Sequence, residues 1–294
     1  MVTRAALAGR LAPVDRWTLG FVALLSLVLV ERWPQLGEAG RPLLVAHLLL
    51  VAAPFLAVRA RAAGPTGCFL GELYPLILTA ALYTEVGLLN RAGGRANDLL
   101  VQGWEQALFG GQPSLEWIRA QPWPWLSWGM HLGYLSYYAT LSAAALAPWA
   151  RGRRYYTRRT VVLVMVAFYG CYAIFLAFPV AGPRYSFPEP RGVAKEVLPA
   201  VLASRLLERG AAWGTAFPSS HVAAALVASV SAGLAWRGLG LALVPLALVL
   251  SLGTVYGQFH YAVDVLGGAL VAALVLAAGR PLTRGLSNRL ESTL

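Results

Sequence analysis

Long apolar runs separated by short polar segments dominate the sequence. A helix needs ~20 mostly apolar residues to cross the hydrocarbon of a bilayer. Eight stretches meet or approach that length: 17–33, 42–58, 68–90, 123–149, 160–181, 216–236, 239–259 and 261–279. The first is the weakest, since an interfacial helix or an uncleaved signal-like anchor would also fit it. The pattern predicts an all-α, polytopic membrane helix bundle with about eight spans.

Two segments interrupt this pattern. Residues 97–120 place apolar residues at helical spacing among acids and tryptophans, which is typical of a helix lying in the membrane interface. Residues 182–215 are rich in proline and charge, and they contain an amphipathic stretch over 193–207. The sequence shows no internal repeat and no soluble domain, so we expect one bundle with interfacial helices.

Composition supports the membrane interpretation. The chain is 58% hydrophobic and 13% charged, whereas soluble domains carry roughly 25% charged residues. The net charge of +11 could indicate nucleic acid binding, but in a membrane chain it more often marks cytoplasmic loops, so we expect no nucleic acid partner. Cys68 and Cys171 fall in apolar runs and form neither a disulfide framework nor a metal set.

Lys/Arg bias predicts the orientation. Segment 151–159 carries five arginines and no acid, so it should face the cytoplasm. Span parity then places both termini there, including Arg4, Arg10 and Arg289. Segments 91–122, 182–215 and 258–261 fall on the opposite face. We expect a multi-pass protein of the cell membrane, that of a bacterial inner membrane, with these segments on the periplasmic side.

Two motifs carry candidate chemistry. In Ala216-Phe-Pro-Ser-Ser-His221, serines and a proline open an apolar helix, and helix N-termini attract anions such as phosphate. In His260-Tyr-Ala-Val-Asp264, the spacing puts both side chains on one helix face. A carboxylate on one ring nitrogen fixes the tautomer and leaves the other free to attack. A capped helix start and a His–Asp pair that joins helices are the structural alternatives.

By span parity, His221 and His260 open two helices at the same membrane face. The basic loop around Arg184 ends the fifth predicted span there too. Two histidines, a carboxylate and a cation at one interface indicate phosphoryl transfer. The sequence has no metal-ligand spacing and no Gly-rich phosphate loop, so we expect neither a metal nor another cofactor.

These motifs resemble those of the type 2 phosphatidic acid phosphatase superfamily. The stretch from Asp98 to Gly111 and the Gly-Pro-Arg-Tyr of 182–185 are similar to its inositolphosphotransferase-like branch. The resemblance covers roughly residues 68–280. It therefore implies two N-terminal spans (1–67), a catalytic six-helix membrane domain (68–280) and a cytoplasmic tail (281–294).

The resemblance also implies residue roles. His260 would attack phosphorus and form a phosphohistidine, and Asp264 would orient it. His221 would protonate the departing oxygen and then deprotonate the attacking water or alcohol. The phosphate oxygens would be bound by Arg184, Ser219 and Ser220. The chain departs from the family pattern at Thr254, where an arginine is usual, and in having no lysine ahead of Arg184.

Further polar residues are candidates for a headgroup or acceptor pocket. Arg191, Lys195 or Arg91 could replace the missing cations. Glu85 could bond a substrate hydroxyl or pair with Arg184, although a carboxylate reaching headgroup water explains it equally well. His131, Tyr134 and Tyr138 form one stripe on a helix, for which packing is the main alternative. We expect His47 to be a packing residue and Glu72 to lie at the membrane interface.

The sequence thus predicts a metal-independent membrane enzyme whose partners are a lipid phosphate substrate, an alcohol acceptor and membrane lipids. The favoured reaction is transfer of a phosphate-linked group to the alcohol through a phosphohistidine. A lipid phosphate or polyprenyl-diphosphate phosphatase is the first alternative. A non-catalytic lipid transporter on the same scaffold is the second.

Overall fold

The computed structural model describes residues 11–286. Within this range the chain is almost entirely helical, and an isolated bridge between Val180 and Thr215 is the one β-type pairing. The orientation predicted for Arg4, Arg10, Arg289 and the end of the tail concerns positions outside the described residues.

Eight long helices coincide with the eight predicted spans. They are α2 (Pro13–Leu36), α3 (Gly40–Ala62), α4 (Pro65–Gly93), α7 (Pro124–Ala150), α8 (Arg154–Ala177), α12 (Ser220–Ala235), α13 (Arg237–Tyr256) and α14 (Ala262–Ala277). The 3₁₀ turn η1 (Gly37–Ala39) joins α2 to α3. Four stretches of the described chain are long and apolar enough to cross a membrane, and one of them comprises both α2 and α3. The predicted all-helical membrane bundle is confirmed.

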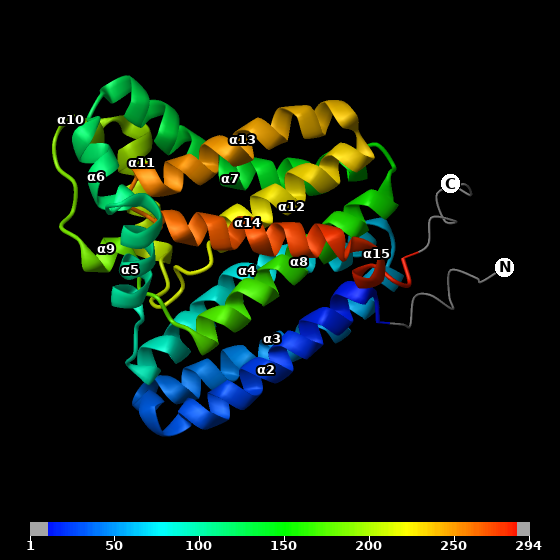
Figure 1. The fold of residues 1–294 in the computed structure, drawn as a ribbon. Coiled ribbons are helices and arrows are strands. Elements are labelled where there is room, and N and C mark those ends of the chain that lie inside the picture. Colours follow the sequence, from blue (N-terminus) through cyan, green and yellow to red (C-terminus); the bar gives the residue numbers. More distant parts are fainter. Residues whose placement is uncertain (1–10, 287–294) are drawn as a thin grey trace.

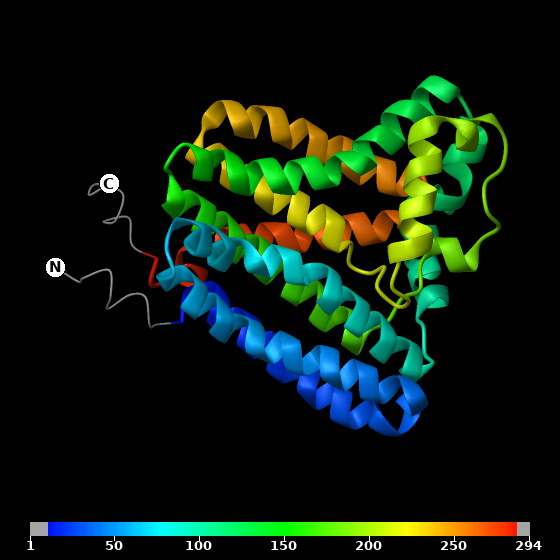
Figure 2. The same ribbon diagram turned by 180° about the vertical axis from the view of Figure 1, so that it is seen from behind.

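Helix α12 lies at the centre of the bundle, where it contacts α7, α8, α13 and α14. Its sequence is mostly alanine, valine and serine, and most of its side chains are buried. The pair α2 and α3 runs along one side of the molecule and packs on α4 (Figures 1 and 2). Small side chains let helices approach closely in a membrane protein, which explains the central place of α12.

Short helices gather at one end of the bundle (Figure 1). They are α5 (Asp98–Phe109), α6 (Pro113–Ala120), α9 (Pro183–Ser186), α10 (Val193–Glu196) and α11 (Leu198–Gly210). The single interfacial helix expected over 97–120 is in fact two helices. Gly110 ends α5 with a φ of +71°, and Pro113 begins α6. A left-handed φ favours glycine, and proline fits the first turn of a helix.

The opposite end carries α15 (Gly279–Leu282) and the arginine-rich segment. The expectation of a loop over 151–159 is wrong for its second half, because α8 begins at Arg154. Arg158 lies in that helix and donates to Glu72 (Nε–Oε1 2.7 Å). Glu72, expected at the interface, is 5% exposed. The pairing explains its burial, because an unpaired charge would be expensive inside the bundle.

Two glycines let α7 and α13 pack against each other. A Cβ atom added at Gly253 would lie 2.2 Å from the Met130 carbonyl oxygen, and one at Gly133 would lie 2.4 Å from Val249. The Met130 oxygen is a backbone atom and cannot yield as a flexible side chain can. At Gly133 the nearest atom is Cγ1 of the Val249 side chain, and the Val249 backbone follows at 3.2 Å. The two helices therefore hold their separation only while these positions lack side chains.

We expect Gly253→Ala to lower the thermal unfolding midpoint of the purified protein in detergent. Overpacking of a tight contact typically costs about 1–3 kcal/mol. Gly129→Ala is the matched control, because an added Cβ there meets nothing within 4 Å. Fluorescence-detected unfolding of both variants makes the measurement. Equal midpoints for the two variants would contradict the packing argument.

Candidate active site

A tight turn places His260 directly before α14. After α13 ends at Tyr256, the main-chain N–H groups of Phe259 and His260 both donate to the carbonyl of Thr254 (2.9 and 3.1 Å). His260 Nδ1 then lies 3.2 Å from Asp264 Oδ2. Both side chains are buried. The carboxylate therefore lies next to one ring nitrogen, as the spacing predicted.

The start of α12 is joined to the start of α14. Ser219 is the N-cap of α12 and accepts from the Val222 N–H (3.4 Å). Its own N–H donates to the main-chain carbonyl of Asp264 (2.8 Å). A Cβ at Gly268 would lie 2.4 Å from the Ser219 carbonyl oxygen. Only glycine allows this approach, which brings two motifs about forty residues apart in the sequence into contact.

His221, in the first turn of α12, faces His260. The ring centroids are 5.8 Å apart and the ring planes are inclined by 61°. Nδ1 of His221 is buried and has no hydrogen-bond partner within residues 11–286. Tyr137 and Tyr134 also contact this ring, at centroid distances of 4.6 and 5.9 Å. The His221 ring is thus packed against three other rings.

A polar pocket of about 150 Å³ lies at the same end of the bundle. It is lined by Arg184, Glu189, Pro190, Lys195, Ser204, Leu207, Glu208, Gly257, Gln258 and Phe259. Phe259 is the residue before His260, but neither histidine lines the pocket. Lys195 Nζ donates to Ser204 Oγ (2.9 Å) and lies 5.8 Å from the Phe259 ring centre. Burial lowers the pKa of Lys195, and the nearby Arg184 charge lowers it further.

The predicted phosphate-binding residues lie at this end of the bundle. Arg184 is exposed on α9 and makes no ion pair with any residue from 11 to 286. Ser219 and Ser220 are buried at the N-terminus of α12, next to His221. A helix N-terminus and a guanidinium without a carboxylate partner both favour an anion.

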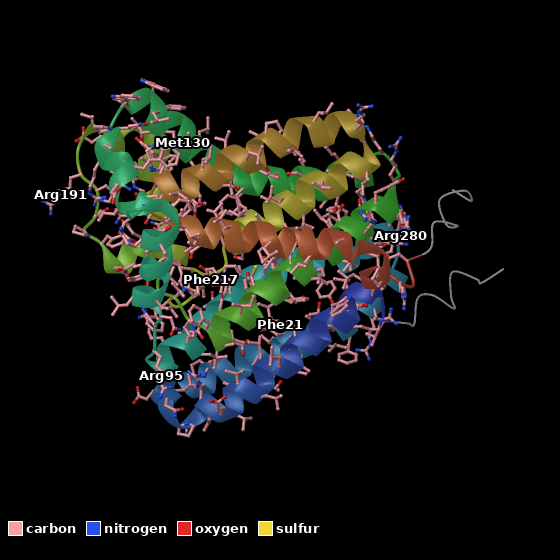
Figure 3. The ribbon with its side chains drawn as sticks, viewed as in Figure 1. Phe21, Arg95, Met130, Arg191, Phe217 and Arg280 are labelled. Atoms are coloured by element: carbon pink, nitrogen blue, oxygen red, sulfur yellow. The ribbon has the colours of Figure 1, made fainter. Side chains whose placement is uncertain are left out.

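Some predicted pocket residues lie elsewhere. Glu85 Oε1 contacts His47 Nδ1 (2.7 Å), and His47 Nε2 contacts Ser26 (2.9 Å), so Glu85 belongs to a cluster of α2, α3 and α4. The suggested partner Arg184 is not the one it has. Arg191 is exposed and points away from the bundle (Figure 3). It does not line the pocket.

The aromatic stripe on α7 lies close to the site. His131 is fully buried, its Nδ1 interacts with Ser127, and its ring meets Phe259 edge-on at 5.7 Å. Tyr134 contacts the same Phe259 ring at 4.5 Å. Tyr138, by contrast, is 55% exposed. His131 and Tyr134 therefore pack against the turn that carries His260. Tyr137, rather than Tyr138, lies beside His221.

Thr254 does not replace the missing arginine. Its hydroxyl donates to the Ser251 carbonyl within its own helix (2.7 Å), and the residue is fully buried. Arg91 is exposed at the end of α4. Arg184 and Lys195 are accordingly the two basic side chains that line the pocket.

Three side chains near the motifs had no role predicted from the sequence: Tyr137, Asp98 and Glu105. Tyr137 follows Tyr134 by three residues on α7, which was the available signal. Asp98 and Glu105 lie seven residues apart on α5, on one helical face, and both are tied to segments more than eighty residues away. Residues 11–286 contain no group of three or more His, Cys, Asp or Glu placed to hold a metal ion.

The fold and the site define a helical membrane protein whose three motifs meet at one end of the bundle. The model of the PAP2 superfamily matches residues 100–278, more than half of the chain. The chain belongs to this superfamily, as the motifs predicted. It matches no curated protein and no solved structure. Membership of the inositolphosphotransferase-like branch stays a prediction.

Proposed function

We propose that this protein is a lipid phosphotransferase that moves a phosphate-linked group to an alcohol acceptor through a phosphohistidine. PAP2 superfamily membership supports phosphatase or phosphotransferase chemistry on lipids. The observation that carries the proposal is the His260–Asp264 pair facing His221. The pocket lined by Arg184 and Lys195 reaches Phe259, the residue before His260.

In the first step, the lone pair on His260 Nε2 attacks phosphorus. The bond between phosphorus and the leaving oxygen breaks, and that oxygen takes a proton from protonated His221. Asp264 stabilises the positive charge that develops on His260. Arg184 and the N-terminus of α12 bind the phosphate oxygens. Proton transfer by a positioned histidine typically contributes about 10²–10⁴-fold in rate.

In the second step, His221 accepts the proton of the incoming hydroxyl. The acceptor oxygen attacks phosphorus, the phosphorus–nitrogen bond breaks, and its electron pair returns to His260. His221 is then protonated again for the next cycle. Both steps use the same two rings, which fits the 5.8 Å between their centroids.

The pocket supports an alcohol as the acceptor. Glu189 and Glu208 line it and can accept hydrogen bonds from hydroxyl groups, while Lys195 and Ser204 can donate to them. Thr254 supplies no cation to the phosphate, so the phosphoenzyme is held by fewer charges than the family pattern provides. An acceptor bound by its own contacts would complete the site and exclude water. Plain hydrolysis of a lipid phosphate is the alternative.

We also propose that the site opens on the extracytoplasmic side of a bacterial inner membrane. The arginine-rich segment and α15 lie at the end of the bundle opposite the short helices, with Arg280 and Arg191 at the two extremes (Figure 3). The positive-inside rule assigns the arginine-rich end to the cytoplasm.

The phosphohistidine mechanism predicts that His260→Ala and His221→Ala each lower the rate by at least about 10³-fold, as removal of a nucleophile or its base does in comparable sites. His47→Gln, which changes a histidine of the α2–α4 cluster, should leave the reaction in place. Turnover of labelled lipid phosphate by purified protein is measured with and without EDTA. An active His260→Ala variant, or a wild type inactivated by chelation, would rule the mechanism out.

Transfer predicts a product ratio that depends on the acceptor. A labelled phospholipid is supplied with and without inositol, glycerol and other polyols, and the products are separated by mass. We expect the alcohol product to exceed the hydrolysis product with at least one acceptor. Lys195→Met should shift the ratio towards water, because it removes a donor from the pocket. Hydrolysis products that dominate with every acceptor would make the protein a phosphatase.

The proposed orientation is tested by cysteine labelling. In a Cys68→Ser/Cys171→Ser background, Arg151→Cys and Arg191→Cys place single thiols at exposed positions of the two ends. An impermeant maleimide should label only the thiol at 191 in intact cells, and both thiols after permeabilisation. The reverse pattern in intact cells would invert the topology.

A further inference from the structure

Helix α5 presents three polar side chains on one face. Asp98, Gln102 and Glu105 are spaced by four and three residues, so they project to the same side of the helix. Val101 on that face is fully buried against a small cluster that includes Val180, Ala216, Tyr261 and Val263. This cluster draws together the basic loop, the segment before His221 and the segment after His260. Helix α5 is therefore packed on all three motifs while contributing to none of them.

Asp98 holds the basic loop. Its carboxylate accepts the main-chain N–H groups of Ala181 (2.9 Å) and Gly182 (2.8 Å), and the hydroxyl of Ser186 lies 3.1 Å away. These residues flank Arg184 on both sides. A carboxylate that binds two successive N–H groups fixes the backbone there more firmly than a neutral acceptor would.

The same carboxylate reaches the residue that follows His260. The hydroxyl of Tyr261 lies 3.0 Å from Asp98 Oδ1 and 2.9 Å from Ser186, and it accepts from the Gln102 amide (3.0 Å). Tyr261 is fully buried. Asp98 thus joins the loop that carries the phosphate-binding cation to the chain neighbour of the nucleophile.

Glu105 caps the helix that carries Asp264. The N-cap of α14 is Tyr261, whose hydroxyl points to Asp98 and cannot accept from its own helix. Glu105 supplies that acceptor from another helix, because its Oε1 receives the N–H groups of Ala262 and Val263, the latter at 3.2 Å. Asp264 receives the Tyr261 N–H (2.8 Å). Two carboxylates therefore share the first N–H groups of α14.

Because Glu105 accepts the Ala262 and Val263 N–H groups, Asp264 can stay in contact with His260. Without Glu105, the partly buried Ala262 N–H and the buried Val263 N–H would lack this acceptor, and the Asp264 carboxylate belongs to the same turn. Any shift of Asp264 towards them weakens its bond to His260 Nδ1. Burial raises the pKa of Glu105 to about 7, and the charge of Asp264 raises it too. The first turn of α14 therefore needs Glu105 as a hydrogen-bond acceptor, and it does not need a full negative charge on that side chain.

We propose that α5 is the positioning element of the site. Asp98 sets the Arg184 loop against the segment that carries His260, and Glu105 sets the first turn of α14 so that Asp264 stays on His260. Neither acid touches the reacting atoms in this assignment. The expected effects on turnover rest on the proposed function. The expected effects on vanadate affinity require only that the site binds an anion.

Four variants of the full-length protein test the assignment. Glu105→Ala removes the acceptor, and Glu105→Gln keeps an amide oxygen for the same N–H groups. Asp98→Asn replaces one carboxylate oxygen by an NH₂ group. One of the two N–H groups of the basic loop then loses its acceptor. Glu116→Ala is the control, because that exposed acid of α6 accepts the Gln112 N–H (2.8 Å), which belongs to none of the three motifs. It also removes the nearby charge that acts on Glu105 without removing the Glu105 hydrogen bonds.

The first measurement is the affinity for orthovanadate, read from tryptophan fluorescence, since vanadate mimics the five-coordinate phosphorus whichever lipid is the substrate. Glu105→Ala and Asp98→Asn should weaken binding at least about tenfold, and Glu105→Gln should stay within about threefold of wild type. The second is turnover, where Glu105→Ala should lower kcat about 10²-fold with little change in KM. Asp98→Asn should also raise KM.

The outcomes separate the two proposals. Vanadate bound equally by wild type, Glu105→Ala and Asp98→Asn overturns the positioning role. A Glu105→Gln variant as impaired as Glu105→Ala overturns the account of Glu105. A third outcome is a wild type that turns over no lipid phosphate while the vanadate affinity still falls in the Glu105→Ala and Asp98→Asn variants. That result supports the positioning role and overturns the proposed reaction. If Glu105→Ala does not fold, Asp98→Asn decides the positioning role.

Discussion

The contact between the first turns of α12 and α14 is the interaction on which the site depends. A single main-chain hydrogen bond, from the Ser219 N–H to the Asp264 carbonyl, joins them, and the missing side chain of Gly268 gives it room. Each helix carries one of the facing histidines at its start. A displacement at this contact would change the distance between the two rings, and in catalytic sites generally a misplacement of about 1 Å can cost about 10²-fold in rate.

The bundle around this contact buries its ionisable side chains in pairs. Within the membrane an unpaired polar group is costly, so each ionisable side chain there needs a partner. Asp15 meets Arg61, Glu72 meets Arg158, and Glu85 meets His47. These pairs lie away from the motifs and tie helices together. Arg184, in contrast, has no ion-pair partner among the described residues, which is consistent with the phosphate-binding role proposed for it.

The end of the bundle that holds the motifs is built differently from the rest. Five short helices and the loops that join them meet there, and their arrangement depends on side-chain bonds to main-chain groups as well as on apolar packing. Asp98 and Glu105 make several of these bonds. Irregular backbone leaves N–H groups that need acceptors, so a cap of short helices is stable only where such acids are supplied.

The sequence by itself determined the class of fold and the motif residues. Apolar runs of membrane-spanning length predict the helices, and a spacing of four residues places His260 next to Asp264 whatever surrounds them. It could not reveal that Glu85 pairs with His47, that Tyr137 rather than Tyr138 covers His221, or that α5 caps α14. Those contacts join residues whose distance along the chain carries no periodic signal. Only the packing of the helices decided them, because close approach depends on which small side chains face each other in three dimensions.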